Sequence, residues 1–292
     1  MYDSNGIINH RPLILAAISD PELAAAQRGR ISASLISITS FLRGLPLFIS
    51  ARPMSPLRVL CMMAFDTLRM FRTAKRLSTE TLRMLAVCLD FEAAANAAFD
   101  RKHSCGNEFR TTRKLLEDAG MTALVTEFTS QLRELETNRP SPGGNHGQFE
   151  KVRSYREAVV RLSLAMVATT AFGHQSIEDE IRATQSDAEL NILFRIAMQC
   201  QIIDDVLDYS KDASAGLPSF LTALTSLPQA LELTHEAALS YADVQDLRQS
   251  AEAFPLRLAL SVVSECAKVV VAFGRRKQKT FCASASNGAR TL

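Results

Sequence analysis

Apolar residues recur at helical spacing along nearly the whole chain. This pattern predicts helices over about residues 12–27, 31–50, 56–75, 78–102, 108–136, 149–172, 187–211, 227–251 and 255–276. No run alternates apolar and polar residues as a half-buried strand would, and no internal repeat of fixed period is present. The pattern therefore predicts an all-α protein.

The interruptions between these helices do not divide the chain into separate domains. The clearest is the loop at 138–147, which is rich in Pro, Gly and Asn, and shorter breaks lie at Gly173 and at 214–219. Neither half of the chain looks self-sufficient, so we expect a mobile loop within one antiparallel helical bundle over residues 12–281. Residues 1–11 are expected to form a flexible lead and residues 282–292 a disordered tail.

Composition narrows the class of protein further. The 12 Gly and 10 Pro are few for 292 residues, which excludes collagen-like and low-complexity proteins. The net charge of +2 and a single basic cluster at 275–279 give little support to nucleic-acid binding. Six scattered cysteines without a CxxC pair favour reduced thiols and a cytoplasmic location. We expect no membrane span, because no apolar run is long enough, and no signal peptide.

Three aspartates, Asp204, Asp208 and Asp212, follow one another at intervals of four residues. On an α-helix they share one stripe, where like charges destabilise the helix unless a cation compensates them. The neighbouring residues are mainly apolar, and a hard divalent cation with oxygen ligands would supply the missing charge. The alternative is an exposed acidic face that closes an amphipathic helix.

A second stripe with the same spacing lies upstream, at Glu92, Asn96 and Asp100, with mainly alanines between them. Together the stripes suggest two helices that face each other across a central cavity and share metal ions through an anion. Mg²⁺ prefers a few carboxylates plus phosphate oxygens to an all-protein cage. The pair therefore predicts a phosphate or diphosphate ligand that also carries a hydrocarbon.

The segment from Gln201 to Asp208, QIIDDVLD, resembles the second aspartate-rich motif of trans-isoprenyl diphosphate synthases. Gln201, Asp204, Asp208, Asp212 and Gly216 are also similar in spacing to a pattern of squalene and phytoene synthases. Both families belong to the class I isoprenoid synthase superfamily. The likeness covers the helical layout of residues 12–280, with specific motif support at 201–219.

Departures from these families favour a one-substrate reaction. The chain lacks the Gly-Lys-x-Arg segment and the first DDxxD of chain-elongating enzymes, and Leu207-Asp208 replaces the Arg-Asp of phytoene and squalene synthases. The Asn-Ser/Thr-Glu triad of microbial terpene cyclases is absent too. The resemblance then implies a terpene synthase that cyclises or rearranges a C15–C20 allylic isoprenyl diphosphate. Head-to-head coupling or another prenyl transfer, a non-catalytic partner subunit of a prenyl synthase, and a ligand-free scaffold remain alternatives.

The resemblance also implies roles for particular residues, and a homodimer. The expected catalytic residues are Asp204, Asp208, Asp100 and Arg156. The expected ligands of several Mg²⁺ ions are Asp204, Asp205, Asp208 and Asp212 on one side and Asp100, Asn96 and Glu92 on the other. The candidate donors to the diphosphate are Arg156, Arg161, Arg153, Lys211, Arg275 and Arg276, with ordinary surface positions as the alternative for the arginines.

Overall fold

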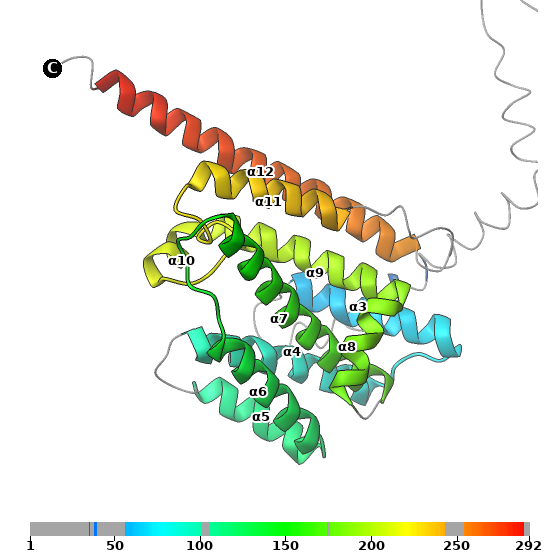
Figure 1. Ribbon diagram of the computed structural model, residues 1–292. Coiled ribbons are helices and arrows are strands. Elements are labelled where there is room, and N and C mark those ends of the chain that lie inside the picture. The colour runs from blue at the N-terminus through cyan, green and yellow to red at the C-terminus, as the bar shows by residue number, and fades with distance from the viewer. Residues whose placement is uncertain are drawn as a thin grey trace, which may run out of the picture.

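The structure is a computed structural model that describes residues 35, 38, 39, 56–100, 106–173, 176–242 and 254–288. Within these ranges the chain is an all-α bundle without strands, which confirms the predicted fold class (Figure 1). The helices are α3 (Pro56–Thr73), α4 (Thr79–Asp100), α5 (Asn107–Asp118), α6 (Thr122–Thr137), α7 (His146–Phe172), α8 (Ile177–Ser186), α9 (Ala188–Leu207), α10 (Tyr209–Ala215), α11 (Leu227–Ala242) and α12 (Phe254–Gly288).

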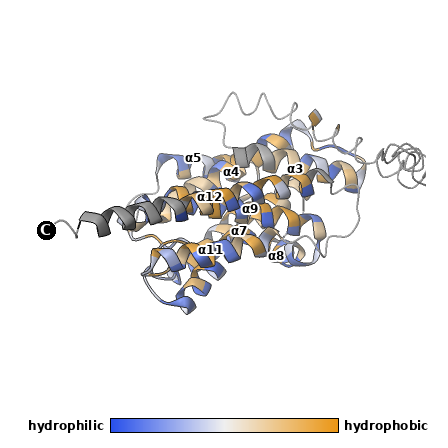
Figure 2. Ribbon diagram, turned by 90° about the horizontal axis from the view of Figure 1, so that it is seen from above, coloured by the Kyte–Doolittle hydropathy of each residue, from blue (hydrophilic) through white to orange (hydrophobic). Residues whose placement is uncertain are grey.

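Helix α9 lies at the centre of the bundle. It packs against α12, α11, α8, α7 and α3, whereas α4 packs against α7, α5 and α3 (Figures 1 and 2). Hydrophobic residues line α7, α9 and α12 where these helices run through the middle of the view in Figure 2. Five phenylalanines fill the core and are almost wholly buried, namely Phe65, Phe91, Phe128, Phe149 and Phe220. Burial of such side chains is the main driving force for this fold.

Local sequence signals set several helix ends. The Ser78 hydroxyl accepts a hydrogen bond from the Thr81 N–H (3.0 Å) at the start of α4, and the Asp187 carboxylate accepts one from the Leu190 N–H (3.0 Å) at the start of α9. Helix α7 ends at Gly173, whose φ of 75° is left-handed and favours glycine. These three boundaries confirm the sequence prediction.

Other boundaries were predicted wrongly. The single helix expected over 108–136 is two helices, because Gly120 (φ 84°) turns the chain between α5 and α6. Helix α8 was not predicted at all. Helix α12 continues to Gly288, so residues 282–288 are helical where a disordered tail was expected. The predicted lead and the helices at 12–27 and 31–50 lie outside the described residues, apart from positions 35, 38 and 39.

The loop between α6 and α7, expected to be mobile, is hydrogen-bonded to the segment that follows α10. The Gly143 N–H donates to the Thr222 carbonyl (2.8 Å) and the Gly144 N–H to the Ala223 carbonyl (2.9 Å). A Cβ on Gly144 would lie 2.5 Å from the Cβ of Gln148, so only glycine fits there. The Gly-rich loop therefore braces the chain next to the aspartate-rich segment.

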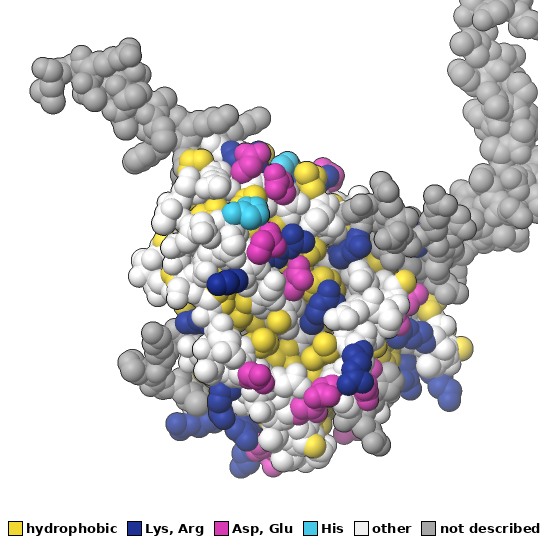
Figure 3. All heavy atoms as spheres, in the orientation of Figure 1, with side chains coloured by type: hydrophobic (Ala, Val, Ile, Leu, Met, Phe, Trp, Pro, Cys, Tyr) yellow, Lys and Arg dark blue, Asp and Glu magenta, His cyan; other side chains and the backbone are white. Residues whose placement is uncertain are grey.

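The expected absence of a membrane span and the expected reduced thiols concern the whole chain, and the structure describes part of it. No helix there is both long and apolar enough to cross a membrane. The four described cysteines, Cys61, Cys88, Cys200 and Cys266, are free thiols. On the face seen in Figure 3, acidic and basic side chains are interspersed.

Candidate functional site: an acidic cluster where α9 meets α10

The three aspartates at four-residue intervals do not lie on one continuous helix as predicted. Helix α9 ends at Leu207, and Asp208 links it to the short helix α10. Hydrogen bonds of helical type nevertheless cross this junction, from the Asp208 N–H to the Asp204 carbonyl (2.8 Å) and from the Asp212 N–H to the Asp208 carbonyl (3.0 Å). The three carboxylates therefore still follow one another on successive turns.

Asp205, the fourth carboxylate of the segment, is buried, and both of its oxygens accept hydrogen bonds inside the fold. It is 1% exposed and forms an ion pair with Arg156 of α7 (Nη2 to Oδ1, 3.0 Å). Gln201 Nε2 donates to the same oxygen (2.7 Å), and the Phe220 N–H donates to Oδ2 (2.8 Å). Burial raises the pKa of Asp205, although Arg156 and the other two donors lower it. These bonds join α9 to α7 and to the loop after α10, so Asp205 holds the segment in place.

Asp212 is buried on α10, and neighbouring carboxylates contribute to raising its pKa. Its pKa is raised from 3.8 to about 6, first by burial and then by Asp205, with a smaller contribution from Asp208. Arg156 and a hydrogen bond with Ser219 act in the opposite direction. Gly216 (φ 65°) ends α10 and turns the chain back so that this serine faces the aspartate. Any cation that reached the cluster would relieve this repulsion.

Asp204 and Asp208 are the carboxylates that solvent can reach. Asp204 is exposed, and the side chain of Asp208 is 41% exposed with the Lys211 ammonium at 2.7 Å from Oδ2. Within the described residues, no three His, Cys, Asp or Glu side chains form a group that could hold a metal ion by themselves. The carboxylate oxygens of Asp204 and Asp208 suit a hard cation such as Mg²⁺, provided that a bound phosphate supplies the remaining ligands.

Of the predicted diphosphate donors, Arg156 and Lys211 lie at this cluster. Arg156 is bound to Asp205 through one nitrogen, while its buried Nε–H has no hydrogen-bond partner among the described residues. A buried donor without a partner is costly, and an anion oxygen would satisfy it. Arg156 is therefore the candidate donor that the geometry supports best.

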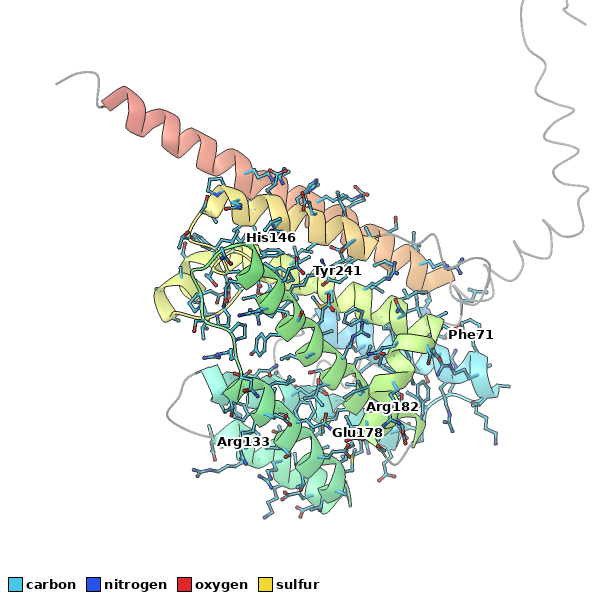
Figure 4. All side chains as sticks on the ribbon, viewed as in Figure 1. Phe71, Arg133, His146, Glu178, Arg182 and Tyr241 are labelled. Atoms are coloured by element: carbon cyan, nitrogen blue, oxygen red, sulfur yellow. The ribbon has the colours of Figure 1, made fainter. Side chains whose placement is uncertain are left out.

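Two other candidate arginines of α7 have partners away from the cluster. Arg153 donates to the Tyr241 hydroxyl (3.0 Å) and to Glu157 (3.2 Å), which links α7 to Tyr241 of α11 (Figure 4). The Arg161 guanidinium lies 3.7 Å from the centre of the Phe194 ring. Both side chains join α7 to neighbouring helices, as in an ordinary structural role.

The basic candidates near the C-terminus lie on α12. Arg275 donates to the Leu231 carbonyl (3.3 Å) and pairs with Glu232 (3.5 Å), which ties α12 to α11. The side chain of Arg276 lies outside the described residues. Neither therefore adds a described contact to the acidic cluster.

The upstream stripe on α4 has a different environment. Glu92 is buried, accepts a hydrogen bond from the Cys88 thiol (3.7 Å) and has another from Ser163 of α7. Burial raises its pKa well above the usual value, more than these hydrogen bonds lower it. Asn96 is half-buried, and the side chain of Asp100 lies outside the described residues. An enclosed carboxyl whose pKa is raised by burial is poorly suited to bind a metal ion.

Two partly buried thiols, Cys61 and Cys200, lie within electrostatic reach of the stripes, and sequence reasoning missed them. Burial raises the pKa of Cys61 to about 12, with contributions from Glu92 and Cys200. Burial likewise raises the pKa of Cys200 to about 11, with Asp204 the next cause. The charge of Glu92 thus acts on Cys61 of α3, and that of Asp204 acts on Cys200 of α9. No sequence signal places Cys61 there, because it is distant in the chain from both stripes.

A groove lies next to the Gly-rich loop. It measures about 860 Å³ and runs between the end of α6, the loop at 138–144 and the first turns of α7. Tyr155 and Lys151 line it, but none of the predicted site residues does. The central cavity between the stripes therefore stays a prediction.

The cluster as a whole can bind a metal cation together with an anion that the cation coordinates. It offers two accessible carboxylates, an acid close to its pKa, and a guanidinium with a free N–H. Comparison of the chain with protein-family models, with curated proteins and with solved structures gives no match. The chemistry of the cluster and the motif from Gln201 to Gly216 are what bear on function.

Proposed function

We propose that the protein is a Mg²⁺-dependent terpene synthase of the class I type, which ionises a C15–C20 allylic isoprenyl diphosphate and cyclises or rearranges the resulting cation. One observation carries the proposal: carboxylates crowd at the junction of α9 and α10, while Asp205 and Arg156 fix that junction from inside. An acidic surface face would not need this internal anchor. The resemblance of residues 201–219 to isoprenoid synthases supports the same conclusion.

The proposed roles follow from accessibility. Asp204 and Asp208 would hold Mg²⁺ on the α9 side, and Asp212 would join them once it loses its proton. The resemblance adds Asn96 and Asp100 of α4 as ligands on the other side. Bound Mg²⁺ would supply Lewis-acid stabilisation of the departing diphosphate. The Arg156 Nε–H and the Lys211 ammonium would donate to diphosphate oxygens.

The proposed reaction needs no second substrate. The bond between C1 and the diphosphate oxygen breaks, and its electron pair leaves with the diphosphate. A double bond of the same chain attacks the allylic cation, and transfer of a proton to the released diphosphate gives a neutral hydrocarbon. The protein contributes electrostatic stabilisation of the leaving group and the shape of the site.

Product analysis tests this proposal. The protein is incubated with Mg²⁺ and C10, C15 or C20 allylic diphosphates, with and without isopentenyl diphosphate, and the extracts are analysed by gas chromatography. A cyclic or rearranged hydrocarbon without isopentenyl diphosphate is the expected result. A doubled linear chain would instead indicate head-to-head coupling, and a need for isopentenyl diphosphate would indicate chain elongation. If no substrate is consumed, the result would favour the alternative that the protein is a non-catalytic partner subunit of a prenyl synthase.

A pair of matched substitutions locates the activity. Asp208→Asn removes one accessible carboxylate and is expected to reduce Mg²⁺-dependent diphosphate release by at least about 100-fold, as removal of a strong electrostatic contribution does. Asp179→Asn, at a carboxylate on α8 that is 72% exposed and pairs with Arg182 of the same helix, is the control. Equal turnover of the two variants would refute the assigned site.

A further inference from the structure

The connection between α6 and α7 contains a short exposed segment that the proposed function does not use. It runs from Asn138 to Pro142 outside regular helical structure, on the left of the view in Figure 1. Both of its ends are fixed, one by the last turn of α6 and the other by the hydrogen bonds that Gly143 and Gly144 donate to the segment after α10. Ser141 is exposed between these two anchors, so its hydroxyl group is presented to solvent at a fixed place.

The sequence of this segment, Arg139-Pro140-Ser141-Pro142, favours an extended backbone. Each proline fixes its own φ at about −65° and has no N–H, and the residue before a proline is restricted to extended conformations. Arg139 and Ser141 both precede a proline, and the Ser141 N–H forms no backbone hydrogen bond with the described residues. A protein kinase binds its substrate as an extended segment, so this loop can enter a kinase active site without local unfolding.

The groove of about 860 Å³ on the α7 side of this segment places a basic side chain next to Ser141. The Ser141 carbonyl accepts a hydrogen bond from Gln148 Nε2 in the first turn of α7. Gln148, Lys151 and Tyr155 are spaced by three and four residues, so they share one face of α7, and all three line the groove together with Ser141. Lys151 therefore lies one helical turn from the residue that holds Ser141.

The charged groups around the groove leave Lys151 available to an anion. Its side chain is exposed and has no ion-pair partner among the described residues. Arg139 also lines the groove, but its charge is compensated by Glu136 of α6 (3.2 Å). Glu150 lines the groove about 100° around the helix axis from Lys151, and His146 begins α7 without lining the groove. A phosphate group on Ser141 would therefore find its cation in Lys151.

We propose that Ser141 is a phosphorylation site for a proline-directed protein kinase, and that Lys151 binds the phosphate group once it is attached. The Ser141 Oγ attacks the γ-phosphorus of a nucleoside triphosphate, and the bond from that phosphorus to the bridging β-phosphate oxygen breaks. The nucleoside diphosphate leaves with that electron pair, and the hydroxyl proton passes to a base of the kinase. The phosphoserine offers three acceptor oxygens and a charge of about −1.5 to −2, to which the Lys151 ammonium donates. The site is independent of the proposed catalysis.

Phosphopeptide mass spectrometry tests the acceptor. The full chain is treated with a proline-directed Ser/Thr kinase and ATP, and it should gain phosphate at Ser141. Ser141→Ala should remove this signal, and Pro142→Ala should reduce it to background, because a kinase of this class recognises the proline that follows the acceptor. The sequence has one other Ser-Pro pair, Ser55-Pro56. Phosphate at Ser55 alone, or none at all, would overturn the proposal, and a peptide of residues 136–146 then shows whether the motif or its presentation in the fold failed.

Phosphorus NMR of the phosphorylated chain tests the role of Lys151. The second pKa of the phosphoserine should lie below its usual value of about 6, because a neighbouring ammonium group stabilises the dianion. Lys151→Gln should return this pKa to about 6, whereas His146→Gln, outside the groove, should leave it at the wild-type value. Circular dichroism checks that each variant is folded. The same phosphate pKa in the wild type and in a folded Lys151→Gln variant would overturn the assignment of Lys151.

Discussion

The two acidic stripes have the same spacing in the sequence but different surroundings in the fold. On α4, Glu92 is enclosed by thiols and Ser163, and its pKa is raised by burial. At the end of α9, Asp204 and Asp208 remain accessible while Asp205 is bonded to Arg156 behind them. Spacing alone decides which residues share a helix face. The neighbouring helices decide whether that face can bind a cation.

In the second stripe, neighbouring residues have separate roles, one structural and the others available for binding. Asp205 takes up the hydrogen bonds and the ion pair that fix the junction, and its neighbours stay free to bind. In the first stripe the acid itself is buried, between Cys88 of its own helix and Ser163 of α7. We therefore expect substitutions to separate folding from binding at the α9 end, and to affect mainly folding at Glu92.

Asp205→Ala should have the largest effect on stability. It leaves Arg156, the Phe220 N–H and Gln201 without their shared partner, and breaking a buried pair typically costs about 3–5 kcal/mol. Urea unfolding measures the loss. Asp204→Ala, one residue away but exposed, should change the free energy of unfolding by less than about 0.5 kcal/mol. Equal losses in both variants would show that Asp205 is not the anchor.

The pH dependence of stability tests the environment of Glu92. A raised pKa in the folded chain means that the contribution of this group is complete below its unfolded value of 4.5 and is lost as the pH rises through the folded value. Relative to Glu92→Gln, the wild type should lose about 1.4 kcal/mol per pH unit over that window.

A matched control for Glu92 is available on α8. Glu178 is 67% exposed and lies near Arg182 (Figure 4), so Glu178→Gln should show no such slope against the wild type. Urea unfolding at a series of pH values above 4.5 gives both comparisons. A flat difference between the wild type and Glu92→Gln would contradict the burial of this carboxyl.

A smaller effect is expected for Asp212, whose pKa is raised to about 6. A metal ion competes with the proton, so the affinity of the wild type for Mg²⁺ with diphosphate should fall as the pH drops through about 6. Well below that pH it should equal the affinity of Asp212→Asn, which stays neutral. Calorimetry from pH 5 to 8 follows the two affinities, and a ratio that does not change with pH would exclude Asp212 from the site.

The smallest effect is expected for Lys211→Ala. The ion pair with Asp208 is exposed, and such pairs contribute little to stability. The melting temperature should stay unchanged, and the affinity for Mg²⁺ with diphosphate should change by less than about tenfold, as for a single exposed charge. A large drop in the melting temperature would mean that the α9–α10 junction depends on Lys211 rather than on Asp205.

Features that depend on nearby residues could be predicted from the sequence. The capping roles of Ser78 and Asp187 and the end of α7 at Gly173 follow from side-chain chemistry and backbone freedom at those positions. The candidate aspartates were found in the same way, because four-residue spacing is a local signal. The break at Gly120 is a local feature of the same kind, because a glycine with positive φ turns the chain there.

Features that depend on contacts between distant residues could not be predicted from the sequence. The junction after Leu207 lies where Arg156 and the loop at Phe220 hold Asp205, and both are far from it in the chain. The burial of Glu92 depends on Cys88 within its helix but also on Ser163 of α7. Helical periodicity contains no information on which distant helix supplies such contacts.

The central claim is that the carboxylates at the end of α9 bind Mg²⁺ together with diphosphate, and titration calorimetry of the full chain tests it most directly. The wild type and Asp179→Asn should bind Mg²⁺ with diphosphate, with little binding of either component alone. Asp208→Asn should show no measurable binding while it keeps the wild-type melting temperature. Unchanged binding by a folded Asp208→Asn variant would contradict the account.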